Sequence, residues 1–270
     1  MGDVVLQKDD DEHVWCLVKK QGDDEMEEMV FACNGVIGDA DLPPVIRTLG
    51  SMRENTFMMA QSVTVMGLGC QSFEDTILTL QEIRLTAERE FKTGMLEKWN
   101  AGAYRGFPVF ALSNRYFCTL KDGAHQEEVP FSKDVDPVGI LQRLARNDLI
   151  HTEENEVQYF KSSVDEDGKR RYQWAQPQLF RVGDIVEVQC SVIIVKGKGT
   201  KHRMKLVLRA IALLDCEIAL EAKRKLSKVR TTEENKTRRL KRKVGYLEDE
   251  EDGETMHKKA RECQDMDESG

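Results

Sequence analysis

The stretch from Gln178 to Cys216 constrains the fold of this chain most, because it holds two long runs of alternating residues joined by a basic, glycine-containing loop. Side chains of a β-strand point alternately to two faces, so a period of two predicts a strand with one buried face. We expect Val188, in the middle of the apolar face of the first run, to be a core residue. That face comprises Val186, Val188, Cys190, Val192 and Ile194.

The second run begins with the same alternation and then becomes apolar on both faces. Met204, Leu206 and Leu208 alternate with other residues, whereas every residue from Ala210 to Leu214 is apolar. A sheet covered on both sides at this end would explain the change. Leu208 is the second predicted core position.

Charge is distributed in blocks along the 270 residues, although the formal net charge is only −8. Residues 1–34 carry −7, residues 35–222 carry −3, residues 223–243 carry +9 and residues 244–270 carry −7. This balance argues against a surface uniformly suited to nucleic acid and leaves local basic segments as the candidates. The length allows one large domain or two small ones.

Seven cysteines are scattered along the chain without any CxxC spacing, and several lie within apolar runs. With an odd count, no signal peptide and no apolar segment of about 18 residues, we expect a reduced, soluble, intracellular protein without a membrane partner. Each cysteine is then interpreted as a small buried hydrophobic residue.

The remaining elements follow from periodicity and turn residues. We expect a hairpin of residues 13–20 with 29–33, a strand at 57–66, and a long helix over Phe73–Trp99, where apolar residues recur every three or four positions. Asp136-Pro137 predicts the start of a short helix, followed by hairpins turning at 154–155 and at 167–168. Alternating strands are expected to bury the aromatic residues of 104–117.

Chemical motifs are weak. The GLGCQS sequence lacks the third glycine of a dinucleotide-binding fingerprint, and the histidines show no metal-ligand spacing. His151 beside Glu153 and Glu154 is interpreted as a hairpin histidine rather than an acid/base pair. We therefore predict no catalytic residue, no metal, no cofactor and no enzymatic activity.

A resemblance covers about 70 residues. The segments DLIHTEENEVQYF (148–160), FRVGDIVEV (180–188) and KLVLRAIALLD (205–215) resemble a recurring block in a large family of uncharacterised fungal proteins. The resemblance implies a shared β-rich module, Asp148 to Asp215, and supplies no activity or site residue.

Two basic segments carry the functional hypotheses. The loop between the two runs could contact a nucleic-acid backbone, or it could be a solvated turn; its candidate contact residues are Lys196, Lys198, Lys201, His202 and Arg203. Beyond a helix ending near Arg230, the charged tail is predicted to be disordered. It contains a cluster with the form of a nuclear-import signal, at Arg238, Arg239, Lys241, Arg242 and Lys243.

The sequence therefore predicts an α+β protein with a mostly antiparallel, barrel-like or strongly bent sheet, one long packing helix and a disordered charged C-terminal tail. We expect a globular region over 1–222, with a β-rich module at about 135–216, and a helical extension and tail over 223–270. Two functions remain open: a non-enzymatic nuclear interaction or regulatory protein that binds another protein, and a nucleic-acid-binding module that uses the basic hairpin loop and the tail. The oligomeric state is left open.

Overall fold

A computed structural model describes residues 4–8, 14–21, 25–47, 56–123, 126–145, 148–197, 199–222 and 224–225. The chain divides into two compact units, Met1–Ala222 and Lys223–Gly270. Lys198, the tail predicted to be disordered and the five residues of the predicted import signal all lie outside the described residues. The architecture below is that of the first unit.

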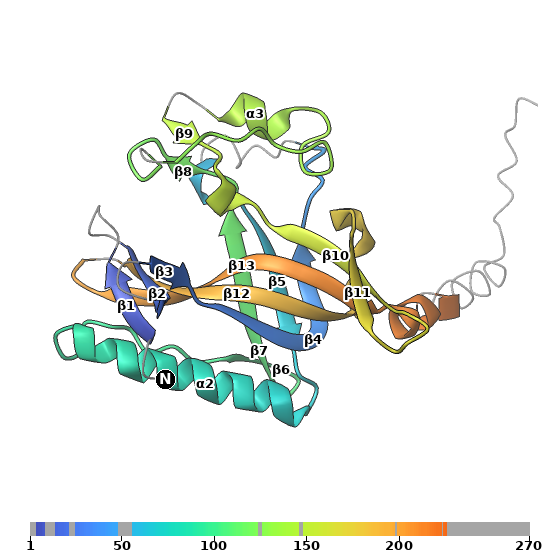
Figure 1. The fold of residues 1–270 in the computed structure, drawn as a ribbon, viewed down its shortest axis with the longest axis horizontal. Coiled ribbons are helices and arrows are strands. Elements are labelled where there is room, and N and C mark those ends of the chain that lie inside the picture. The colour runs from blue at the N-terminus through green and yellow to red at the C-terminus, as the bar shows by residue number, and fades with distance from the viewer. Residues whose placement is uncertain are drawn as a thin grey trace, which may run out of the picture. The chain divides into compact units, whose positions relative to one another are not determined.

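A large, mostly antiparallel sheet dominates the described chain, with eleven strands among the described residues (Figure 1). Along its main path the strand order is β11-β10-β13-β12-β4-β5-β7-β6, and β1, β2 and β3 branch from β12. Only β10 and β13 pair in parallel within it. The strands are β1 (Val4–Lys8), β2 (Val14–Gln21), β3 (Glu25–Glu28), β4 (Val30–Asp41), β5 (Ala60–Met66), β6 (Gly102–Tyr104), β7 (Phe107–Arg115), β10 (Gln158–Val164), β11 (Arg170–Trp174), β12 (Ile185–Lys196) and β13 (His202–Asp215).

The predicted central hairpin is confirmed as β12 and β13, which pair along almost their whole length. Val188 and Leu208, the two predicted core positions, are both 0% exposed. Residues 210–213 are all buried, as expected from their two apolar faces. A register shift between Gln189 and Cys190 exchanges which residues of β13 face the core.

The sheet is strongly bent in Figure 1, where β5 and β7 run steeply across the direction of β12 and β13. Its bend encloses the main core, which contains buried residues of β4, β5, β7, β12 and β13. β7 also reaches β13 directly, since the Asn114 side chain donates a hydrogen bond to the carbonyl oxygen of Leu208, 3.2 Å away. The α+β class, the large sheet and the single long helix are as predicted.

The long helix α2 (Gln71–Ala87) packs its apolar stripe on this core through Phe73, Ile77, Leu80, Ile83 and Ala87. The prediction that it continues to Trp99 is wrong. After a 3-10 turn, η2 (Glu88–Glu90), Gly94 adopts a φ of +77° and Leu96 forms a bridge with His202. Pairing with the β12–β13 loop thus replaces the last helical turns, although the apolar spacing continued.

Two predicted hairpins have different partners. β2 pairs with β3, Glu25–Glu28, within the acidic segment predicted to be a loop, whereas residues 30–33 belong to β4. Residues 149–160 do not form a hairpin: β9 (Leu149–Ile150) pairs with β8 (Cys118–Thr119), and η3 (Glu153–Asn155) separates it from β10. The hairpin at 167–168 is confirmed as β10–β11.

A second, smaller core lies at the end of β7, around Tyr116, Phe117, Leu141 and Leu149. The prediction that its short helix begins at Asp136-Pro137 is wrong, because α3 (Ile140–Leu144) begins after Gly139 as its N-cap. The Asp136 carboxylate still accepts hydrogen bonds from the backbone of Ile140 and Gln142. Of the aromatic residues at 104–117, Phe110, Tyr116 and Phe117 are buried, whereas Tyr104 and Phe107 are exposed. Another 3-10 turn, η1 (Thr56–Met58), precedes β5, and η4 (Pro177–Leu179) precedes β12.

Candidate nucleic-acid interface

The basic hairpin loop joins β12 to β13, whose last paired residues are Lys196 and His202. The Gly197 amide donates to the carbonyl oxygen of Lys201 at 2.7 Å, and Gly199 has a φ of +70°, so the turn is tight. Lys196 and Lys201 are exposed. They are the two described candidates of this loop with side chains available to an approaching phosphate.

The other two described candidates are engaged with the protein. His202 packs its ring against Trp15 and Phe91, at centroid distances of 4.8 and 4.7 Å. Burial, assisted by the charge of Lys196, lowers the pKa of His202. Arg203 forms an ion pair of 2.8 Å with Glu97, and this hydrogen bond lowers the pKa of Glu97.

Backbone hydrogen bonds fix the same loop to the segment after α2. The His202 amide donates to the carbonyl oxygen of Met95, and the Glu97 amide donates to the carbonyl oxygen of His202, both at 2.8 Å. His202, at the base of the loop, is therefore fixed by two backbone hydrogen bonds, and the exposed lysines Lys196 and Lys201 extend from a rigid base.

Two further cations lie beside this loop, outside the five contact residues predicted from the sequence. Lys205 lies on the outer side of β13, and Arg115 ends β7, which meets β13 at the Asn114–Leu208 hydrogen bond. Both side chains are half-buried, and within the described residues neither forms an ion pair with an acid. Burial and the nearby positive charges of Arg115 and Arg203 lower the pKa of Lys205.

Arg115 also has an aromatic neighbour. Its guanidinium carbon lies 4.2 Å from the ring centroid of Phe57, and one of its nitrogens lies 3.7 Å from the sulfur of Met58. Burial lowers the pKa of Arg115, while the charge of Asp122 acts in the opposite direction. An arginine stacked on a ring next to a lysine is a combination that binds phosphates and bases.

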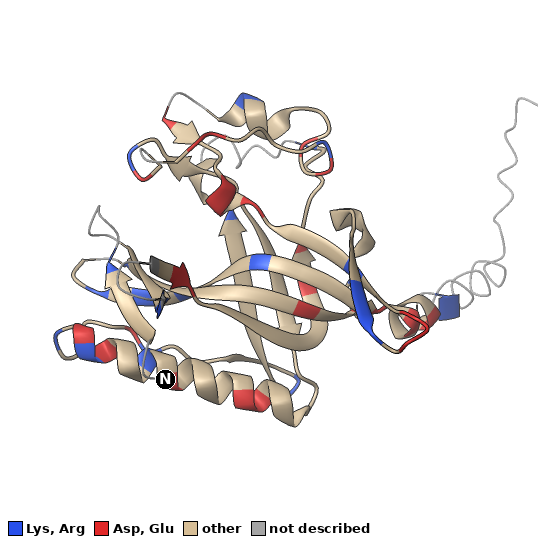
Figure 2. Cartoon of the chain, viewed as in Figure 1, with Lys and Arg blue, Asp and Glu red and all other residues tan. Residues whose placement is uncertain are grey.

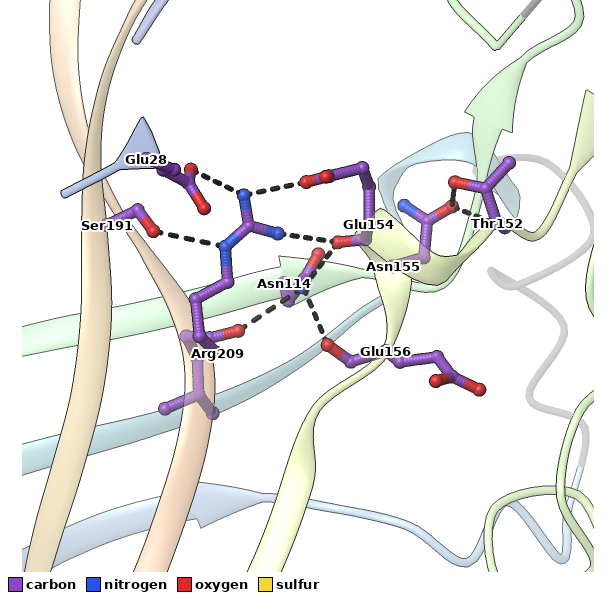
Figure 3. Close-up of polar contacts among 9 residues, drawn as sticks. Glu28, Asn114, Thr152, Glu154, Asn155, Glu156, Ser191 and Arg209 are labelled. Carbon is purple, nitrogen blue, oxygen red and sulfur yellow. Dashed lines mark hydrogen bonds and ion pairs between the residues drawn. The ribbon is translucent and has the colours of Figure 1, made fainter. Parts of the chain in front are cut away.

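Arg209, further along β13, has acidic partners. Its guanidinium contacts Glu28 of β3 at 2.6 Å and the Glu154 side chain at 2.8 Å, and it donates to the Ser191 hydroxyl at 3.1 Å (Figure 3). Burial lowers the pKa of Arg209, but the hydrogen bond that it donates to Glu28 and the charge of Glu154 outweigh this effect, so that the pKa is raised. This arginine is therefore a structural clamp and not a free cation.

The amide of Asn114 closes the seam next to this clamp. Its nitrogen donates to the carbonyl oxygens of Glu154, Glu156 and Leu208 at 2.9, 3.3 and 3.2 Å (Figure 3). Thr152 and Asn155 hold the 3-10 turn in place with a capping box. β7, β13 and the turn after β9 are thus joined by one buried side chain.

Exposed aromatic residues gather at the other end of the sheet. Trp174 is 74% exposed and Tyr172 is 46% exposed, both on β11. Figure 2 shows basic residues on the same strand, which are Arg170 and Arg171. The hairpin was predicted from its turn at 167–168 but given no functional role, although the alternation in RRYQW (170–174) places Tyr172 and Trp174 on one face.

The interpretation of His151 as a hairpin histidine near solvent is wrong, because residues 149–160 form no hairpin and the side chain is covered. It is buried, its Nδ1 lies 2.8 Å from the carbonyl oxygen of Tyr116, and its ring stacks on Phe131 at 4.0 Å. Burial lowers its pKa. It contributes to the walls of two cavities of about 340 and 320 Å³, and no cluster of metal-ligating side chains occurs in the described part of the chain.

Comparisons with known proteins do not assign a family or a function to this chain. No family model matches the chain, and no curated protein matches it. Among solved structures, the crystal structure of gp2.5, a single-stranded DNA-binding protein encoded by bacteriophage T7, aligns with 70% of this chain and 92% of that chain. The identity is 14% and the TM-score is 0.38. A score of this size does not establish a shared fold. None of the described helices is long and apolar enough to cross a membrane.

Proposed function

We propose that this chain binds single-stranded nucleic acid and that Lys205 and Arg115 hold its phosphate backbone. The observation that carries the proposal is that these two half-buried cations form no ion pair among the described residues; only the more distant charge of Asp122 acts on Arg115. Buried charges in proteins are normally paired, because the loss of water is otherwise uncompensated. The missing counter-charge is then supplied by a bound anion.

The surroundings favour a polymer over a single small anion. Lys196 and Lys201 extend from the adjacent loop, and Phe57 stacks on Arg115. Several cations along one surface with an interspersed ring are typical of sites that follow a nucleic-acid backbone. The outer face of β5 and β7 beside Arg115 carries small side chains, which leave room for a strand to lie on the sheet: Ser62, Thr64, Ala111 and Ser113.

The strand arrangement supports the same function. Five strands follow in the order β7-β5-β4-β12-β13, and β7 contacts β13, so the bent sheet has the form of a partly open five-stranded barrel. Barrels of the OB type bind oligonucleotides on their second and third strands and on the loops joining strands one to two and four to five. Counted along the chain, the second and third strands are β5 and β7. The loop between strands one and two is the segment that contains Phe57, and the loop between strands four and five is the basic hairpin loop.

The nucleic-acid function is therefore favoured over a protein partner, the first of the two classes that the sequence left open. A protein ligand would need an acidic segment to satisfy the two cations. A polyphosphate backbone provides a regular series of such charges without any sequence requirement.

The test uses the full chain with a fluorescein-labelled oligothymidylate of about 16 nucleotides, the upper end of the site sizes of single OB folds. Anisotropy titrations between about 50 and 200 mM salt give the slope of log K against log[salt]. The double variant Lys205→Gln/Arg115→Gln should flatten that slope by about 1.4 units, since each phosphate contact on a single strand contributes about 0.7. The control variant Lys133→Gln/Arg181→Gln removes the same charge from two exposed positions and should leave the slope unchanged.

Urea unfolding separates this result from a loss of structure. The Lys205→Gln/Arg115→Gln variant should be at least as stable as the parent, because it removes two half-buried positive charges that repel each other. A parent protein that does not bind the oligonucleotide, or a double variant with the slope of the control, would show that these cations do not hold a phosphate backbone.

A further inference from the structure

The β10–β11 hairpin lies outside the five strands considered above and places three aromatic rings on one face. Phe160 of β10 is directly opposite Trp174 of β11, and their ring centroids are 4.7 Å apart. Tyr172 is two residues before Trp174 and Arg170 two residues before Tyr172, so all three side chains of β11 point to the same face. The Tyr172 hydroxyl makes a long contact of 3.5 Å with the Glu187 carboxylate on this face.

This aromatic face belongs to the outer side of the sheet. Phe160 pairs with Ala212 of β13, which pairs with Glu187 of β12. Glu187 points outward, because its neighbours Val186 and Val188 are in the core. Lys205 points outward for the same reason, since Met204 and Leu206 are buried. The rings and Lys205 thus lie on the same side of the sheet. Lys205 is near the start of β13, and the rings are beside its C-terminal end.

The stability of the fold does not explain why two large aromatic side chains of β11 are exposed. Large aromatic side chains stabilise a protein by leaving water, yet Trp174 and Tyr172 remain largely solvated. Arg171, on the opposite face, is paired with Asp165, whereas Arg170 on the aromatic face has no ion pair to an acid in the described chain. The face therefore combines stacking surfaces with an available cation.

We propose that Tyr172 and Trp174, with Phe160 behind Trp174, form a platform on which unpaired bases of the bound strand stack, with Arg170 next to the adjoining phosphate. This inference rests on the proposed function and assigns a second contact to the same ligand. Exposed aromatic residues on a sheet face bind two or three bases in this way in RNA-recognition domains, and the contact accepts any base because every base has a π-face. A paired base has no free face, so the platform selects single strands.

The spacing of the two contacts sets a minimum ligand length. Ala212, the neighbour of Phe160, is seven positions beyond Lys205 on β13, so the two contacts are about 23 Å apart along the strand. At about 3.4 Å per nucleotide of a stacked strand, a ligand of about seven nucleotides spans both. This length lies within the range of 4 to 16 nucleotides, roughly, that one OB fold covers.

The test compares oligothymidylate with an abasic oligonucleotide of the same length, using the full chain. The variant Tyr172→Thr/Trp174→Thr keeps residues suited to a strand, and the control Gln173→Thr changes the exposed residue between them on the opposite face. The double variant should bind oligothymidylate about 30-fold more weakly, the change that corresponds to about 1 kcal/mol for each of two stacked bases. Its affinity for the abasic strand and its salt slope should stay at the parent values, and the control should match the parent throughout.

A second measurement needs no variant. Trp174 is the most exposed tryptophan described, since Trp15 and Trp99 are partly buried in the core, so it should dominate quenching of the fluorescence by acrylamide. Bound oligothymidylate should protect it from acrylamide, and the abasic strand should not. Equal protection by both strands would overturn the platform.

The outcomes distinguish the two proposals. A parent that binds and a Tyr172→Thr/Trp174→Thr variant that binds equally well would overturn the platform and leave the proposed function standing. A parent that binds neither strand would remove both. Sedimentation of the free proteins tests whether a second copy of this chain occupies the aromatic face. A dimeric parent and a monomeric Tyr172→Thr/Trp174→Thr variant would assign the face to that second copy and overturn the platform.

Discussion

Asn114 provides the sharpest test of how the bent sheet is held together. Its side chain is only 5% exposed and donates to three backbone carbonyls, those of Glu154, Glu156 and Leu208. Asn114→Ala removes all three contacts. The carbonyl of Glu154 keeps a hydrogen bond from Arg209, but that of Leu208 lies in the core and loses this donor.

The expected loss follows from these contacts. An unsatisfied buried carbonyl destabilises by about 1–3 kcal/mol, and the lost hydrogen bonds add about 1 kcal/mol, so Asn114→Ala should lower the free energy of unfolding by about 2–4 kcal/mol. Asn114→Leu fills the space again but donates no hydrogen bond. If the missing donor causes the loss, Asn114→Leu should be about as unstable as Asn114→Ala.

Urea unfolding, followed by circular dichroism, measures this as a lower midpoint with an unchanged m-value. Ser113→Ala, on the exposed face of the same strand, is the matched control and should change stability by less than about 0.5 kcal/mol. An Asn114→Ala protein as stable as this control would refute the reasoning, and recovery of stability in Asn114→Leu would attribute the loss to volume.

Three further predictions concern the core, a thiol and the tail. Leu208→Ala should cost about 2–5 kcal/mol in urea unfolding and Val188→Ala less, because both side chains are fully buried; mutants as stable as the parent would contradict the strand register. Iodoacetamide should alkylate Cys70 before Cys190 near neutral pH, because hydrogen bonding with Ser72 lowers the pKa of Cys70, whereas burial raises the pKa of Cys190 to about 12. Mass spectrometry of the labelled peptides gives the order of alkylation, and faster labelling of Cys190 would contradict the prediction. We also propose that the basic cluster at 238–243 directs nuclear import. Changing Lys241, Arg242 and Lys243 to Ala in a large fluorescent fusion should then leave the protein in the cytoplasm, and unchanged nuclear accumulation would contradict the proposal.

The sequence predicted the central hairpin well because its signal is local. Alternation alone identified Val188 and Leu208 as core positions, and the two apolar faces near Ile211 predicted the burial of residues 210–213. The end of α2 could not be predicted in the same way. Its apolar spacing continues past Ala87, and only the long-range pairing of Leu96 with His202 ends the helix.

The candidate site was predicted only in part for the same reason. The loop lysines are visible in the sequence as a basic run, but Arg115 lies about 90 residues from Lys205 in the chain, and only the closure of β7 onto β13 brings them near each other. For Trp174 and Tyr172, alternation with polar residues indicated a strand but gave no information on which face would be covered. That depends on β11 being the edge of the sheet.

The two basic residues Lys205 and Arg209 show why the anion is expected at one end of β13. They are four residues apart and both reach the outer side of the strand, so the sequence gives them equal weight. The acidic residues Glu28 and Glu154 approach only Arg209 and neutralise it. A phosphate that approaches the middle of β13 therefore meets two carboxylates, whereas one that approaches near Lys205 meets uncompensated positive charge. Under the proposed function, Glu28 and Glu154 would therefore restrict backbone binding to the loop end of the strand, and bases would reach the rings at the opposite end.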